Sequence, residues 1–112
     1  MHEINNIFNI TKHKLTEEFF EDILKTKFFR IERIISDGHV SPKGFWYNQE
    51  EDEFVLMLKG SAEIEFEEGI LKLNSGDYLN IPAHTKHRIK WTDLKEKCFW
   101  LAVHYNKKNH DE

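Results

Sequence analysis

Cysteine is almost absent from this sequence: Cys98 is the single one, so no internal disulfide can form. Its apolar neighbours favour an inert buried thiol over a nucleophile. The 16 lysines and arginines form no basic run, which argues against a nucleic-acid partner. No apolar run approaches the roughly 20 residues that cross a bilayer, and the first residues lack the form of a signal peptide. We therefore expect no membrane partner and a cytoplasmic location.

What the chain does contain suits one globular domain with a mildly acidic surface. It has 112 residues, 39% of them hydrophobic and 32% charged, with a net charge of -4. A chain of this length can bury roughly 65% of the surface that its unfolded form exposes. We expect no second domain.

Short runs of β-branched and aromatic residues, separated by turn signals, predict an all-β domain from residue 28 onward. About eight antiparallel strands joined by tight turns predict a sandwich or small barrel. Residues 1–27 form a packing segment in which 15–24 fit either a short helix or an edge strand, and 106–112 form a polar tail. The predicted strands cover residues 28–36, 53–58, 62–67, 70–73, 78–82, 88–91 and 97–105.

Two stretches carry the candidate chemistry. Glu53 stands where a polar segment enters an apolar strand that ends at Gly60, and a carboxylate there must be hydrated, paired or bound to a cation. Downstream, a second predicted hairpin brings in the imidazoles of His84 and His87. We read the acidic run at residues 50–52 as a solvated loop, because adjacent like charges gain most from water.

These two stretches resemble the two sequence motifs of the cupin family. Glu53, six residues and Gly60 match the second half of the first motif, and Gly76, Pro82 and His87 match the second. The resemblance covers roughly residues 28–105 and implies a double-stranded β-helix, the cupin jelly-roll barrel. The two first-motif histidines are missing. The longer motif spacing puts Trp46 and Asn48 in their places, and the shorter spacing puts Tyr47 and Gln49 there.

The resemblance also implies a divalent metal site inside the barrel. Glu53 and His87 would be the retained ligands, Asn48 a weaker oxygen ligand, and His84 a less favoured candidate. Carboxylate and imidazole suit Zn, Fe, Mn or Ni. The alternative is that Glu53 and His87 contact each other in a metal-free pocket. The ligand pocket is expected to include Trp46, Gln49, Met57 and Trp91.

Strand parity adds an expectation about assembly. If Glu53 faces the interior, Val55 and Met57 do too, while Phe54, Leu56 and Leu58 face outward. Three large apolar side chains on an outer face need a cover. We expect a homodimer, or else the N-terminal segment, to provide it.

The functional expectation is a single-domain cupin that binds a small molecule in its barrel, with dioxygenase- or isomerase-type chemistry possible through a metal. The alternative is a non-catalytic module, a ligand sensor or a structural cupin whose degenerate site holds no metal. The sequence does not decide between them, because one fold serves many functions.

Overall fold

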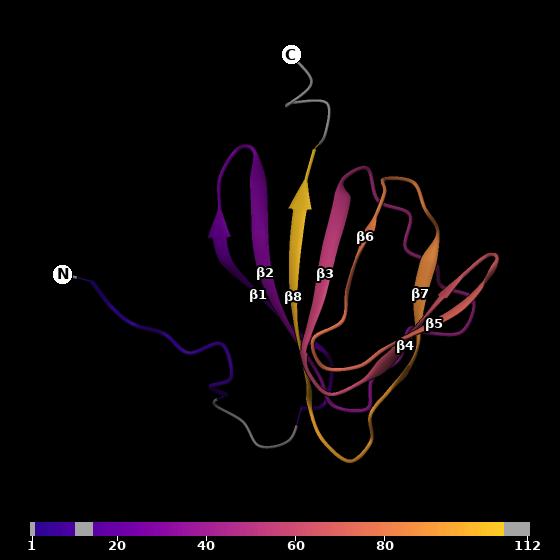
Figure 1. The fold of residues 1–112 in the computed structure, drawn as a ribbon, viewed down its shortest axis with the longest axis horizontal. Coiled ribbons are helices and arrows are strands. Elements are labelled where there is room, and N and C mark those ends of the chain that lie inside the picture. Colours follow the sequence, from indigo (N-terminus) through magenta and orange to yellow (C-terminus); the bar gives the residue numbers. More distant parts are fainter. Residues whose placement is uncertain (1, 11–14, 107–112) are drawn as a thin grey trace.

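The structure, a computed structural model, describes residues 2–10 and 15–106. A five-stranded sheet in the order β1-β2-β8-β3-β6 and a three-stranded sheet in the order β5-β4-β7 enclose the interior (Figure 1). Within the described residues there is no helix, and so none that could span a membrane. The strands are β1 (Phe19–Lys25), β2 (Phe29–Ser36), β3 (Asp52–Lys59), β4 (Ala62–Phe66), β5 (Gly69–Leu73), β6 (Tyr78–Ile81), β7 (His87–Thr92) and β8 (Cys98–Tyr105).

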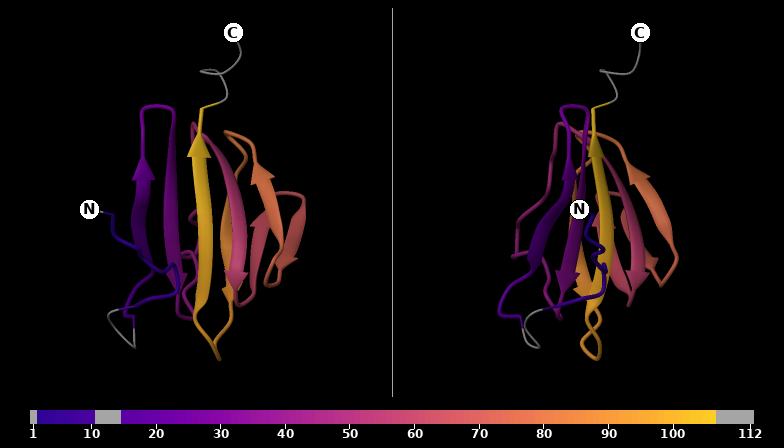
Figure 2. Two further views of the ribbon diagram at one scale, coloured as in Figure 1. Left: turned by 60° about the vertical axis from the view of Figure 1, so that its left-hand side comes forward. Right: turned by 90° about the vertical axis from the view of Figure 1, so that its left-hand side faces the viewer.

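The pairing of the strands confirms the all-β jelly-roll prediction. Every strand pair is antiparallel, and the last strand, β8, lies in the middle of the larger sheet between β2 and β3. Figure 2 shows β1 at the free edge of this sheet and the smaller sheet beside its opposite edge. Both sheets turn apolar side chains toward the enclosed core, whose buried members include Ile34, Val55, Met57, Ile64, Ile81, Trp100 and Ala102.

The central strand β3 shows the alternation that positions the site. Val55 and Met57 are buried at 3% and 0% exposure, whereas Phe54, Leu56 and Leu58 are half-buried. Successive side chains of a strand point to opposite faces, so Glu53 shares the inner face with Val55 and Met57. The parity prediction therefore agrees with the burial along this strand.

Gly60 ends β3 with a backbone that only glycine adopts easily. Its φ is +97°, and a Cβ there would lie 2.8 Å from the Cys98 Sγ atom and 3.0 Å from the Cys98 Cα atom. The left-handed conformation costs other residues about 1–2 kcal/mol, and the backbone of β8 leaves no room for a side chain. The glycine of the first motif thus lets the chain reverse against β8.

The short helix considered for residues 15–24 does not form. Residues 19–25 make up the edge strand β1, all seven of them exposed, which pairs with β2 through a bulge between Asp22 and Leu24. Residues 7–9 lie on the outer face of the larger sheet. There Phe8 packs edge-on against Phe99 at 5.3 Å, and the Arg33 guanidinium donates to the backbone carbonyls of residues 7 and 9.

Some predictions concern residues outside the described part of the chain. Most of the polar tail, residues 107–112, and four residues of the N-terminal segment, 11–14, belong to this group. That these residues form a tail outside the barrel thus stays a prediction from the sequence.

Candidate functional site

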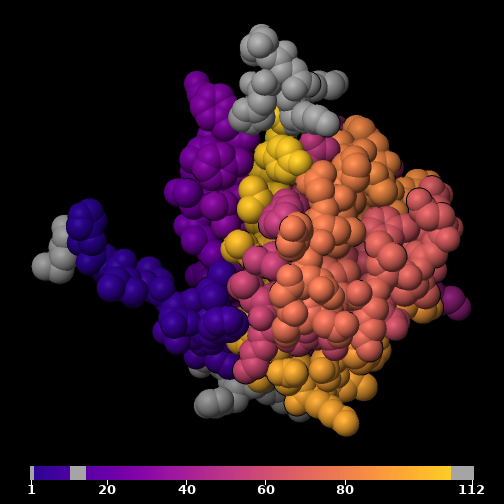
Figure 3. Space-filling model, in the orientation of Figure 1, coloured from indigo at the N-terminus to yellow at the C-terminus, as the bar shows by residue number. Residues whose placement is uncertain are grey.

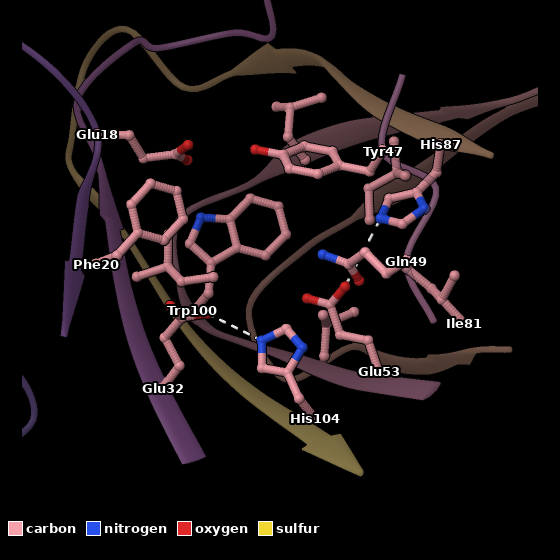
Figure 4. A pocket seen from close by; sticks show the side chains of 14 residues that line it. Glu18, Phe20, Glu32, Tyr47, Gln49, Glu53, Ile81, His87, Trp100 and His104 are labelled. Atoms are coloured by element: carbon pink, nitrogen blue, oxygen red, sulfur yellow. Dashed lines mark hydrogen bonds and ion pairs between the residues drawn. The ribbon is translucent and has the colours of Figure 1, made fainter. Parts of the chain in front are cut away.

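A cavity of about 70 Å³ lies between the two sheets. One buried water needs roughly 10–15 Å³ of such space, so the cavity is larger than a single water requires. The surface that faces the cavity is mainly apolar, and its apolar lining residues are Phe20, Ile34, Val55, Ile64, Ile81, Ile89 and Trp100. Its polar lining residues are Glu18, Glu32, Tyr47, Gln49, Glu53, His87 and His104 (Figure 4).

Glu53 and His87 meet across the cavity from different sheets. The Glu53 Oε1 and His87 Nε2 atoms are 3.7 Å apart, and the two residues are only 7% and 5% exposed. The other ring nitrogen of His87, Nδ1, donates to the Thr85 carbonyl at 2.9 Å. This bond fixes the ring so that Nε2 faces the carboxylate.

The surroundings of His87 favour its charged form. Burial alone lowers the pKa of the imidazole, but the Glu53 carboxylate and the Thr85 carbonyl outweigh burial and raise the pKa above its usual value of 6.5. The charged imidazole and the carboxylate therefore form an ion pair inside the cavity wall. Such a pair can donate to a ligand or accept a proton from it.

Tyr47 lies over His87 and is held there by backbone bonds. The Tyr47 N–H donates to the His87 carbonyl at 2.7 Å, and the His87 N–H donates back at 3.1 Å. The two rings stack with 5.4 Å between centroids and 23° between planes. Burial, and then the nearby carboxylates of Glu18, Glu53 and Glu32, raise the pKa of the Tyr47 hydroxyl. This part of the cavity is therefore electronegative.

A second imidazole lies in the wall beside Glu53. His104 on β8 is the direct cross-strand partner of Glu53 on β3, and it is 3% exposed. Its Nε2–H donates to Glu32 Oε1 at 3.0 Å, while the Arg30 guanidinium contacts Glu32 Oε2 at 3.2 Å. The remaining ring nitrogen, Nδ1, is buried and has no hydrogen-bond partner among the described residues.

A third carboxylate, Glu18, closes the cavity beside Trp100. The Ser36 hydroxyl donates to Glu18 and accepts the Trp100 indole N–H at 3.2 Å. Burial raises the pKa of Glu18 although the Ser36 bond acts in the opposite direction. The indole N–H is thus occupied inside the protein, and the ring presents its apolar surface to the cavity.

The structure separates the residues predicted for the metal site. Glu53 and His87 meet, but Asn48 and His84 are exposed and do not line the cavity. His84 has a φ of +62°, and its backbone N–H donates to the Gln49 carbonyl at 2.7 Å. The backbone of His84 thus stabilises the loop. The shorter motif spacing gives the better account, because Tyr47 and Gln49 line the cavity at the places of the two missing histidines.

The residues predicted for the ligand pocket divide in the same way. Gln49 lines the cavity, whereas Met57 is wholly buried in the core and is not part of the cavity wall. Trp46 and Trp91 lie elsewhere, with the Arg88 guanidinium 6.0 Å from the Trp46 ring and the Lys72 ammonium 5.4 Å from the Trp91 ring. These two tryptophans therefore contact cations outside the cavity.

Asp52, the last residue of the acidic run at residues 50–52, is not solvated as predicted for that run. Asp52 is 8% exposed and accepts a hydrogen bond from the Ala83 N–H at 2.7 Å. A buried carboxylate needs such a donor. This hydrogen bond holds the turn between β6 and β7 against the start of β3. Because β7 begins at His87, the bond also helps to position His87.

The sequence reading missed Glu18, Glu32 and His104 as parts of one site. Strand parity along the apolar run of β8 could have assigned His104 to the inner wall. Glu18 and Glu32 gave no such signal. They reach the cavity from the loop before β1 and from β2, and nothing local in the sequence marks that position.

A resident transition metal does not fit the donor groups of this cavity. Such ions are usually held by at least three nitrogen, oxygen or sulfur ligands from the protein. Glu53 and His87 face each other, but Tyr47 and Gln49 stand in the places of the two histidines, and His104 is held by Glu32 through its Nε2 atom. Across residues 2–10 and 15–106, no three or more His, Cys, Asp or Glu side chains form a group that could hold a metal ion.

Comparison with known proteins agrees with the architecture. A structure from Ralstonia eutropha, provisionally named a mannose-6-phosphate isomerase, is 42% identical, with a TM-score of 0.89 over 94% of this chain and 99% of that chain. A cupin superfamily protein from Desulfitobacterium hafniense is 20% identical, with a TM-score of 0.70 over 85% of this chain and 83% of that one. Among proteins with curated functions, none matches.

The family model described as "Cupin domain" matches residues 34–104. This range takes in both motif stretches and all strands from β3 to β7. The chain therefore belongs to the cupin family.

Proposed function

We propose that this cupin binds a small organic molecule between its two sheets, with Glu53 and His87 as the polar anchors. The observation that carries the proposal is the meeting of this acid–base pair, 3.7 Å apart, inside a wall whose surface is mainly apolar. Small-molecule sites are typically concave and mainly apolar, with a small number of polar groups that point into them. No metal ion takes part in this proposal, since the donor set does not fit one.

Isomerase-type chemistry is the second candidate. It is favoured by the name of the Ralstonia protein and by an acid–base pair suited to moving a proton between neighbouring carbons. A phosphorylated sugar is a poor match, because no lysine or arginine lines the cavity while three glutamates do. If the protein is an isomerase, we expect its substrate to carry no phosphate.

The binding proposal is tested by thermal shift and calorimetry with a library of small metabolites in the presence of a chelator. Glu53→Gln and His87→Asn should weaken binding of any hit roughly 10- to 100-fold, as expected for a lost charge-assisted hydrogen bond. Glu68→Gln and His84→Asn make the same chemical changes at exposed positions and should leave binding intact. Hits that bind equally well to both sets of variants would contradict the proposal.

We also propose that the protein forms a homodimer through the outer face of the larger sheet. The half-buried side chains of Phe54, Leu56 and Leu58 lie on this face. The N-terminal segment contacts Phe99 but leaves Phe19 39% exposed and Tyr78 68% exposed. In the space-filling view, the indigo residues of this segment cover only the lower left of the visible face (Figure 3). A second copy would cover what the segment does not.

A further inference from the structure

The starting point is the unpaired nitrogen of His104. Nε2–H donates to Glu32, so in the uncharged form of the ring the lone pair lies on Nδ1, which then accepts hydrogen bonds. It is buried and has no partner among the described residues, although buried polar atoms in native proteins are nearly always paired. In Figure 4 this nitrogen lies on the ring edge turned away from Glu32, on the side of Glu53.

A second acceptor lies beside it. Glu53 and His104 are cross-strand partners on β3 and β8, and both side chains line the cavity. Glu53 has its His87 partner 3.7 Å away, which leaves carboxylate lone pairs for other donors. Two neighbouring acceptors are satisfied together by a ligand group that donates more than one hydrogen bond.

The charges around these acceptors are mostly negative. The carboxylates of Glu18, Glu32 and Glu53 line the cavity, and no lysine or arginine does. Arg30 contacts Glu32 at 3.2 Å from outside the lining, and the charged form of His87 faces Glu53 at 3.7 Å, so two of the three charges are offset and that of Glu18 is not. A positively charged ligand group is therefore favoured over a neutral one, and an anion is disfavoured.

Aromatic rings complete the surroundings. Trp100 uses its N–H on Ser36, so the ring face is what it offers to the cavity, and Tyr47 and Phe20 also line the wall. Figure 4 shows Glu18 and Phe20 on one side of the indole, with Glu53 and His87 on the other. Aromatic faces together with carboxylates are the usual means of holding an organic cation.

Together these features identify a ligand class. We infer that the cavity binds a small organic molecule with a primary ammonium group, which donates to His104 Nδ1 and Glu53 while its apolar part lies against Trp100. A hydroxyl would donate without the charge, and a quaternary ammonium would carry the charge without donating. This inference rests on the proposed small-molecule function and specifies its substrate class.

Three probes of nearly the same shape test the inference: 3-methylbutylamine, 3-methylbutan-1-ol and 3-methylbutanoate. Calorimetry on the full chain at about pH 8 keeps the amine protonated, because alkyl ammonium groups resemble lysine with a pKa near 10.4. We expect the amine to bind at least roughly tenfold more tightly than the alcohol, and the carboxylate to bind least.

Two variants test which side chains recognise the ammonium group. His104→Phe keeps a planar ring and removes the acceptor, so amine affinity should fall roughly tenfold while alcohol affinity falls less. Glu18→Gln removes one charge at a half-buried position and should weaken only the amine. Its matched control is Glu17→Gln, a neighbouring exposed carboxylate outside the cavity, which should bind all probes like the wild type.

The outcomes separate this inference from the proposed function. Equal binding of amine and alcohol would overturn the ammonium inference while leaving a small-molecule pocket. Binding of none of the three probes by the folded protein would overturn both. An amine preference that survives in Glu18→Gln and in a folded His104→Phe variant would also overturn it, because the selectivity would then arise elsewhere.

Discussion

Glu53 and His87 illustrate how two residues of this cupin control one another. The imidazole is held by the Thr85 carbonyl, and its free nitrogen faces a carboxylate 3.7 Å away. Each partner makes burial of the other less unfavourable, since an unpaired buried charge is costly. We therefore propose that the pair is a binding element, and we expect it to make the stability of the fold depend on pH.

The raised pKa of His87 predicts the sign of that dependence. Because the folded protein holds the proton more tightly than the unfolded chain, the stabilising contribution is complete below about pH 6.5. It is lost as the pH rises through the raised folded value. Urea unfolding at several pH values should show this decline in the wild type and not in His87→Asn. A decline that is unchanged in the variant would contradict the assignment to His87.

Ser36 makes a second prediction at the residue level. It is wholly buried and links the Trp100 indole N–H to the Glu18 carboxylate. Ser36→Ala would leave both groups without this partner, which should lower the free energy of unfolding by about 1–3 kcal/mol. Urea denaturation measures the change. Ser61→Ala, a change of the same residue type at a half-buried turn, is the control and should cost clearly less.

At the level of elements, the strands are the part of the fold that the sequence predicts well. Apolar and acidic residues alternate along β4, a pattern of period two that indicates a strand with one buried face. Strand β1 gave no such pattern because it is exposed along its whole length, so a helix remained an equal alternative. Its pairing with β2 is a long-range contact that the local sequence does not encode.

The site was predicted only as far as the motifs reached. The spacing to Gly60 identified Glu53, and the second motif identified His87. The first-motif histidines are replaced, so the spacing alone did not decide between Asn48 and Gln49, which lie on opposite sides of the local chain. The remaining acids come from segments far apart in sequence, and their meeting depends on the packing of the two sheets.

Gly60 gives the prediction that belongs to this level. Gly60→Ala places a Cβ at a φ of +97° and within 2.8 Å of the Cys98 sulfur. We expect a loss of about 2–4 kcal/mol in the free energy of unfolding, from backbone strain and displacement of β8. Thermal or urea unfolding measures it. Gly69→Ala, which meets nothing within 4 Å although its φ is also positive, should cost less; equal losses would refute the role of the β8 contact.

At the scale of the whole molecule, the two sheets have different tasks. The inner faces enclose the cavity, while the outer face of the larger sheet retains exposed apolar side chains beyond the reach of the N-terminal segment. Apolar surface of this kind commonly marks a protein interface. In our proposals, assembly and ligand binding use opposite faces of the same strands.

The proposed dimer is tested by changing Leu56 on that outer face. Leu56→Lys should shift the protein from dimer to monomer in sedimentation equilibrium, because a buried lysine without a partner is strongly unfavourable in an interface. Ile70→Lys introduces the same charge at a half-exposed position on β5 of the smaller sheet and should leave the dimer intact. A wild-type protein that is monomeric at micromolar concentration would contradict the proposal.

The central claim is that the cavity between the sheets binds a small molecule through its own side chains. It is tested most directly by NMR of the isotope-labelled protein, with small amines and alcohols added in the presence of a chelator. We predict that the shifts concentrate on the Trp100 indole and on the backbone at Glu53, His87 and His104, and that they disappear in Glu53→Gln. Shifts that appear only after a divalent metal is added, or that lie on the outer sheet face, would contradict the account.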